Sequence, residues 1–127
     1  IMVKPFIAVI AILIVFPLQS LAEQTLSKAQ VSELFAGKTV HYRVVSNDLK
    51  VVAFFDAGGE ARELRGEKRD VHPWWVKDDG KHCIQFKGKK PGCLPVVRRD
   101  DGSYVKYRKG KLLVEYNSFE QGNPNNL

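Results

Sequence analysis

The stretch Lys38–Glu60, KTVHYRVVSNDLKVVAFFDAGGE, predicts two β-strands, a tight turn between them and a hairpin turn after them. Apolar and polar residues alternate over Lys38–Val45, which is the two-residue period of a strand with one buried face. Val51–Asp56 is rich in the β-branched and aromatic residues that favour strands, and the glycines of Ala57–Glu60 favour a hairpin turn. The stretch therefore predicts an antiparallel sheet.

Short strands separated by turns continue to Phe119. The most polar of them is Ala61–Gly66, and we expect it near an edge of the sheet. Even spacing of this kind favours an antiparallel meander. We predict a mainly β fold, a small antiparallel meander barrel of roughly seven to eight strands, because closure removes exposed strand edges. The further strands are expected at Ala61–Gly66, Val71–Lys77, Lys81–Phe86, Cys93–Arg98, Ser103–Lys109 and Lys111–Phe119.

One short N-terminal helix is expected before the strands, within Leu26–Gly37. Ser27 and Gln30 have the spacing of a capping box, and Gly37 is placed to end the helix in a left-handed conformation. The apolar face of this helix should plug or flank one end of the barrel. Its members are Val31, Leu34 and Phe35.

Residues 1–22 have the composition of a cleavable export signal. One basic residue, Lys4, precedes the uncharged apolar run Phe6–Phe16, and Ser20-Leu21-Ala22 supplies small residues for signal peptidase. The run is shorter than the roughly 20 apolar residues that span a bilayer. We expect cleavage after Ala22, no transmembrane anchor in the mature chain, and a periplasmic or secreted location.

Residues 23–119 are expected to form a single β-barrel-like domain, and the polar residues 120–127 a flexible tail. The only cysteines, Cys83 and Cys93, should pair across a hairpin, because disulfides persist in exported proteins. Paired cysteines serve neither as nucleophiles nor as metal ligands. The hairpin should bury the opposite face, which carries Ile84, Phe86, Leu94 and Val96.

Several short motifs together carry a family resemblance. LFAGKTV at Leu34–Val40 follows the helix, and Phe55-Asp56-Ala57-Gly58 is an aromatic-Asp-x-Gly turn. With these motifs the chain resembles a family of small exported bacterial proteins that have a lipocalin-like β-barrel and no assigned function. The resemblance implies a lipocalin-like barrel and export, and brings no catalytic residues; Trp74 and the lysine-rich hairpin tip depart from it. The other matching positions are Trp75, Val76, Asp78 or Asp79, Gly80, Cys83, Cys93, Asp101, Gly102 and Tyr104.

The sequence offers no constellation typical of an enzyme. The carboxylate pairs Asp78-Asp79 and Asp100-Asp101 each precede a glycine, so we interpret them as turn residues. No serine lies at a strand–helix elbow. The histidines do not have metal-ligand spacing. We therefore expect no catalysis, no metal and no cofactor. The three histidines are His41, His72 and His82.

The segment Lys87–Lys111 is strongly basic. Its nine cations are opposed only by Asp100 and Asp101, so it carries +7 while the whole chain carries +6. Such a face can bind an anionic envelope component, although a plain solvated surface is the commoner outcome. Export argues against nucleic acid as the partner. The candidate anion-binding residues are Lys87, Lys89, Lys90, Arg98, Arg99, Lys106, Arg108, Lys109 and Lys111.

Aromatic residues form the second candidate site. A small barrel either fills itself with side chains or holds one small ligand. The leading functional hypothesis is a non-catalytic exported protein that binds a small apolar or amphipathic ligand at the barrel mouth; the alternative is docking through the basic face. Oligomeric state and ligand identity stay open. The candidate pocket residues are Phe54, Trp74, Phe86, Tyr107 and Tyr116.

Overall fold

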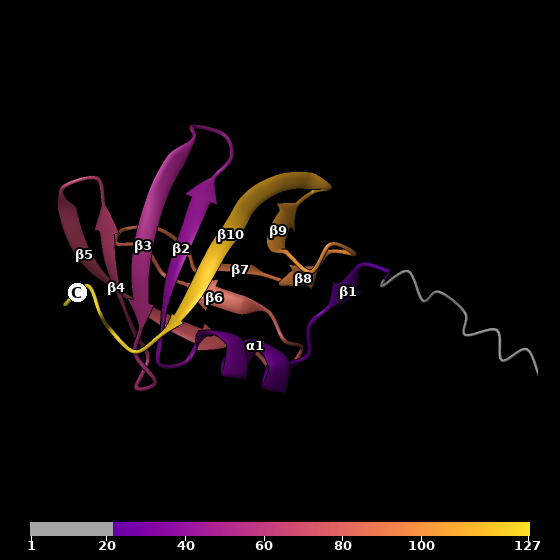
Figure 1. Ribbon diagram of the computed structural model, residues 1–127, viewed down its shortest axis with the longest axis horizontal. Helices are drawn as coiled ribbons and strands as arrows, with labels where there is room; N and C mark the ends of the chain where they lie inside the picture. The colour runs from indigo at the N-terminus through magenta and orange to yellow at the C-terminus, as the bar shows by residue number, and fades with distance from the viewer. Residues whose placement is uncertain (1–21) are drawn as a thin grey trace, which may run out of the picture.

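The computed structural model describes residues 22–127. The predicted export signal lies outside this range except for Ala22. Within these residues, one helix, α1 (Lys28–Phe35), accompanies ten strands in a single antiparallel sheet (Figure 1). The strands are β1 (Gln24–Thr25), β2 (Lys38–Val44), β3 (Leu49–Phe55), β4 (Glu60–Arg65), β5 (Lys68–Val76), β6 (His82–Ile84), β7 (Gly92–Leu94), β8 (Val97–Arg98), β9 (Tyr104–Arg108) and β10 (Lys111–Gln121).

The mainly β prediction is confirmed, and the sheet curls into a half-barrel in which β6 and β7 pass behind β2 and β10 (Figure 1). The ten strands exceed the predicted seven to eight partly because β1 and β8 are only two residues long. The sheet order is β1-β8-β9-β10-β2-β3-β4-β5-β6-β7, so the last strand lies beside β2. The prediction that Ala61–Gly66 lies near an edge of the sheet is wrong, because β4 lies between β3 and β5.

The described sheet has no hydrogen-bonded pairing between β7 and β8, although these strands follow each other in the sequence. Pro95 lies between them and has no backbone N–H to donate. β7 instead comes into contact with β9. β10 has register shifts between Leu112 and Val114 and between Tyr116 and Ser118, and such bulges bend a strand.

Helix α1 covers one end of the curled sheet (Figure 1). The predicted capping box is confirmed, because the Ser27 hydroxyl accepts from the Gln30 N–H at 3.3 Å and the Gln30 side chain accepts from the Ser27 N–H at 2.9 Å. Val31 and Phe35 are fully buried, whereas Leu34 is only half-buried. Phe35 packs edge-on against Phe55 at 5.2 Å between ring centroids. The helix therefore plugs this end mainly with Phe35.

The turn at Gly80 holds the start of the helix. Gly80 has φ of +90°, and a Cβ there would lie 2.6 Å from the carbonyl oxygen of Leu26. Only glycine tolerates both the positive φ and this close approach. Lys28 also pairs with Asp78 of the same turn at 2.8 Å.

The predicted disulfide is confirmed. Cys83 and Cys93 are bonded across β6 and β7, with their Cα atoms 4.1 Å apart. Trp75 lies opposite Cys83 in the register, so it shares the disulfide face of the sheet, and it is 36% exposed. Trp74 points the other way into the core, where its indole N–H donates to the Asp56 carbonyl oxygen at 2.8 Å.

The tail is shorter than predicted and is hydrogen-bonded to the sheet. β10 continues to Gln121, which pairs with Lys38. Beyond it, the Gly122 N–H donates to the Gly37 carbonyl at 2.9 Å, and the buried Thr39 hydroxyl donates to the Gly122 carbonyl at 2.7 Å. Within residues 22–127, no helix is both long and apolar enough to cross a membrane.

Candidate ligand-binding cavity

The concave side of the sheet holds an open cavity of about 430 Å³. This volume falls within the usual range for small-molecule sites, about 300–1,000 Å³. Its walls are mostly apolar, and the buried rings of Tyr42 and Tyr116 add two hydroxyl groups. No acidic residue is found among the described residues that line it. The apolar lining comprises Val44, Phe55, Ile84, Phe86, Leu94, Leu113 and Val114.

Five cations line the same cavity: Arg65, Lys89, Lys90, Lys106 and Arg108. Lys89 and Lys90 are exposed on the turn between β6 and β7, and Arg108 is exposed at the end of β9. Lys106 is different, because only 6% of its surface is exposed. The cavity therefore combines apolar walls with positive charge both at its mouth and inside.

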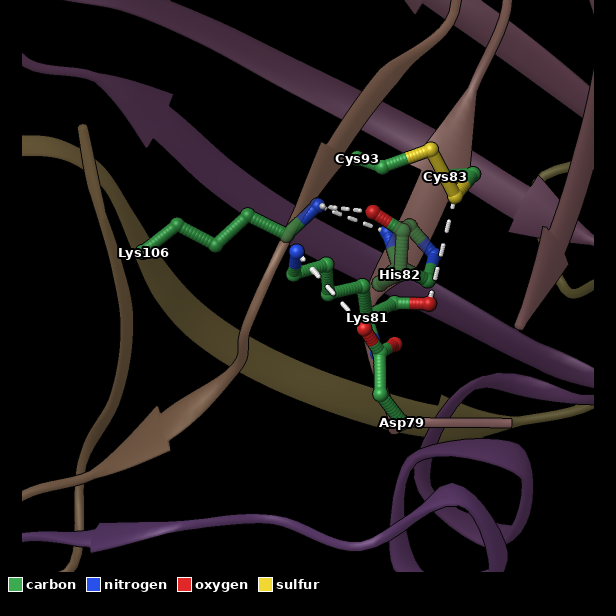
Figure 2. Close-up of a disulfide and its surroundings, with 6 residues drawn as sticks. All are labelled: Asp79, Lys81, His82, Cys83, Cys93 and Lys106. Atoms are coloured by element: carbon green, nitrogen blue, oxygen red, sulfur yellow. Dashed lines mark hydrogen bonds and ion pairs between the residues drawn. A yellow bond between two sulfur atoms is a disulfide. The ribbon is translucent and has the colours of Figure 1, made fainter. Parts of the chain in front are cut away.

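Lys106 extends from β9 across to β6 (Figure 2). Its ammonium nitrogen lies 2.7 Å from the Nδ1 of His82 and 3.4 Å from the His82 carbonyl oxygen. This contact joins β9 to β6 near the place where β7 and β8 are not paired with each other. Burial, followed by the nearby charge of Arg108, lowers the pKa of Lys106 to about 7.

His82 is fully buried and stacks on Phe35 at 4.1 Å between ring centroids. Burial, followed by the charge of Lys106, lowers the pKa of His82 well below its ordinary value. The imidazole is therefore neutral at pH 7, and its Nδ1 accepts a hydrogen bond from Lys106. The remaining ring nitrogen, Nε2, has no hydrogen-bond partner within the described chain.

A second polar cluster surrounds Glu63 on β4. Its carboxylate accepts from the Arg65 Nε at 2.7 Å and from the Tyr42 hydroxyl at 3.3 Å, and it lies 3.1 Å from the His72 Nε2. Burial, followed by the charge of Glu63, raises the pKa of Tyr42. Arg65 also lies over the Phe86 ring at 5.6 Å. The charge of Arg65 is thus matched by a buried carboxylate, unlike that of Lys106.

Phe86 and Tyr116, two of the predicted pocket residues, line the cavity, but the other three do not. Phe54 alternates with the buried Phe55 and so points to the outer face of β3. Trp74 packs in the core against Phe55 at 5.4 Å between ring centroids. Tyr107 faces away from Lys106, and its hydroxyl donates to the Glu23 carboxylate at 3.0 Å.

The predicted basic face divides into two groups. Lys106 is not on the surface, because the face that it shares with Tyr104 and Arg108 is the concave face of β9. Lys89, Lys90 and Arg108 lie at the cavity, whereas Arg98 donates to the Gln24 side chain at 2.8 Å. The remaining members lie outside the cavity: Lys87, Arg99, Lys109 and Lys111.

The sequence did not identify Arg65 or His82 as part of the site. Side chains two apart on a strand share a face, so Arg65 lies on the same inward face of β4 as the buried Ala61. The alternation in the sequence could have identified Arg65. Nothing local indicated that Lys106 of β9 would reach His82 of β6, because the two residues are 24 positions apart.

The interpretation of the aspartate pairs as turn residues is confirmed for Asp79 and Asp101. Asp79 accepts from the Lys81 N–H at 3.1 Å, and Asp101 accepts from the Ser103 N–H at 2.9 Å. In the described part of the chain, no cluster of three His, Cys, Asp or Glu side chains could hold a metal ion. The expected lack of catalysis stays a prediction.

No family model matches this chain, and comparisons with characterised proteins and with solved structures found no match.

Proposed function

We propose that the protein is a non-catalytic, exported binding protein whose curled, lipocalin-like sheet holds one small apolar or amphipathic ligand at its mouth. The observation that carries this proposal is the cavity of about 430 Å³ with seven apolar wall residues. Transfer of an apolar ligand from water to such walls is favourable by about 25 cal/mol for each Å² buried. A periplasmic or secreted location is part of the proposal, and the Cys83–Cys93 bond supports it.

The proposal is tested by filling the cavity. Val114→Trp adds a large ring to the wall formed by β10, whereas Val71→Trp adds the same ring at a position that is 60% exposed. Native mass spectrometry of the exported protein with decanol or decanoate should show a one-to-one complex. We expect Val114→Trp to lose this complex and Val71→Trp to keep it. Equal binding by both variants, or no complex with wild type, would contradict the proposal.

A second candidate function is docking to an anionic envelope component through the basic residues outside the cavity. It is favoured by the exposure of Lys87, Lys109 and Lys111, which lie on turns or at a strand end. Binding of this kind weakens as salt is added, because exposed charges are screened over about 8 Å at physiological ionic strength. Vesicles with anionic lipid, titrated at low and high salt, separate it from uptake into the cavity.

A further inference from the structure

Lys106 is a buried lysine without a matching carboxylate. Within residues 22–127, the ammonium group hydrogen-bonds only to the imidazole and the carbonyl oxygen of His82. The imidazole is neutral and so does not balance the positive charge of Lys106. The nearby Arg108 adds a second positive charge. The charge of Lys106 is therefore not balanced by a negative group of the described chain, and Lys106 also lines the cavity.

An isolated buried charge costs several kcal/mol unless it is paired and hydrogen-bonded. The fold meets this requirement elsewhere, since Glu63 lies next to Arg65 and His72. Lys106 has no such carboxylate among its hydrogen-bond partners in residues 22–127, and it also lines the cavity. A ligand that brings its own negative charge would supply the missing partner.

We propose that the ligand of this cavity is an amphiphile with a single acidic group, a carboxylate or a phosphate, which binds the ammonium group of Lys106. This inference rests on the proposed binding function and specifies its ligand class. The apolar chain lies against Ile84, Leu94 and Val114, and the exposed Lys89 and Lys90 attract the anion to the mouth. A charge-assisted hydrogen bond inside the cavity holds the acidic group more strongly than a neutral hydroxyl.

The lowered pKa of Lys106 supports this assignment and predicts a second measurable effect, the uptake of protons when an acid binds. An empty cavity holds the amine partly neutral at pH 7, and an anion bound beside it favours the protonated form. Binding of an acid should therefore take up protons at pH 8, whereas binding of an alcohol should not. The other polar or charged groups around the cavity are His82 on β6, Arg108 on β9, Tyr42 on β2, Tyr116 on β10, Arg65 on β4, and Lys89 and Lys90 on the turn after β6.

The experiment compares decanoate, decyl phosphate and decanol by titration calorimetry with the exported protein at pH 8, in buffers of different ionisation enthalpy. At least one acid should bind about tenfold or more tightly than decanol, the scale of one charge-assisted hydrogen bond. Its binding should also take up protons. The tighter of the two acids identifies the acidic group as carboxylate or phosphate.

Lys106→Met removes the ammonium group and keeps the length of the side chain, and Lys111→Met is the matched control outside the cavity. We expect Lys106→Met to lose most of the preference for the acids over decanol and to bind them without proton uptake, while Lys111→Met behaves as wild type. If wild type binds decanol as tightly as both acids, the inference is wrong and the binding function stands. If wild type binds none of the probes, both fail. The comparison of probes on wild type decides the matter even if Lys106→Met does not fold.

Discussion

Lys106→Met should change how the stability of the protein depends on pH. In the folded protein, burial and then Arg108 lower the pKa of Lys106 from 10.5 to about 7. The unfolded chain therefore binds more protons than the folded chain between these two values. Where this holds, the free energy of unfolding rises with pH. The cost of burying Lys106 is fully present below pH 7 and disappears as the pH approaches 10.5.

The size of the effect follows from the same pKa values. Between about pH 7 and pH 9, linkage predicts that the free energy of unfolding of wild type rises by about 2 kcal/mol from this residue alone. Higher pH is less informative, because burial raises the pKa of Tyr42 and Tyr116, and tyrosines of the unfolded chain ionise near pH 10. Lys106→Met should lack this rise. It should also be more stable than wild type at pH 7, because methionine places no charge in the cavity.

The assay is urea unfolding of ligand-free protein at pH 7, 8 and 9, followed by tryptophan fluorescence. Lys111→Met is the control, since this residue is exposed and should keep the pH dependence of wild type. If wild type and Lys106→Met gain the same free energy of unfolding between pH 7 and 9, the buried lysine is not the cause and the reasoning is refuted.

Three further predictions concern the fold and export. Phe35→Ala should destabilise the protein by about 3–5 kcal/mol in urea unfolding, because the ring is fully buried, and Leu34→Ala should cost clearly less. Glu63→Ala should cost about 2–4 kcal/mol, because it leaves Arg65 without its carboxylate; a loss below about 1 kcal/mol would mean that this cluster is not stabilising. N-terminal sequencing of the exported protein should begin at Glu23, and an uncleaved N-terminus would overturn the predicted signal.

The sequence was sufficient for features set by neighbouring residues. Ser27 and Gln30 predicted the capping box because both partners lie within one helical turn. The two cysteines predicted their bond because the intervening turn places β6 beside β7. Adjacent residues of a strand point to opposite faces, and the structure accordingly buries Trp74 and exposes Trp75.

The sequence was not sufficient for features that depend on distant strands. The pairing of β10 with β2 joins residues such as Val114 and Val44, and no local pattern specifies it. On β9, the two-residue period of a strand puts Lys106 and Arg108 on one face, but this period does not show which face is concave. Val105 and Lys106 are both buried although they point in opposite directions, so composition suggested the wrong orientation for the lysine.

The two polar clusters in the curled sheet differ in a way that stability alone does not explain. Arg65 has the buried carboxylate of Glu63 beside it, so its charge is matched within the protein. Lys106 is more deeply buried than Arg65, yet within residues 22–127 its ammonium group hydrogen-bonds only to the neutral imidazole and the carbonyl oxygen of His82, and a further cation lies on its own strand. A methionine would fill this position without the cost of a charge. Residues that lower the stability of a fold, such as an unpaired buried charge, are expected at functional sites. An acidic ligand would remove this conflict when it binds, so the same residue that destabilises the empty cavity would give the occupied one its selectivity.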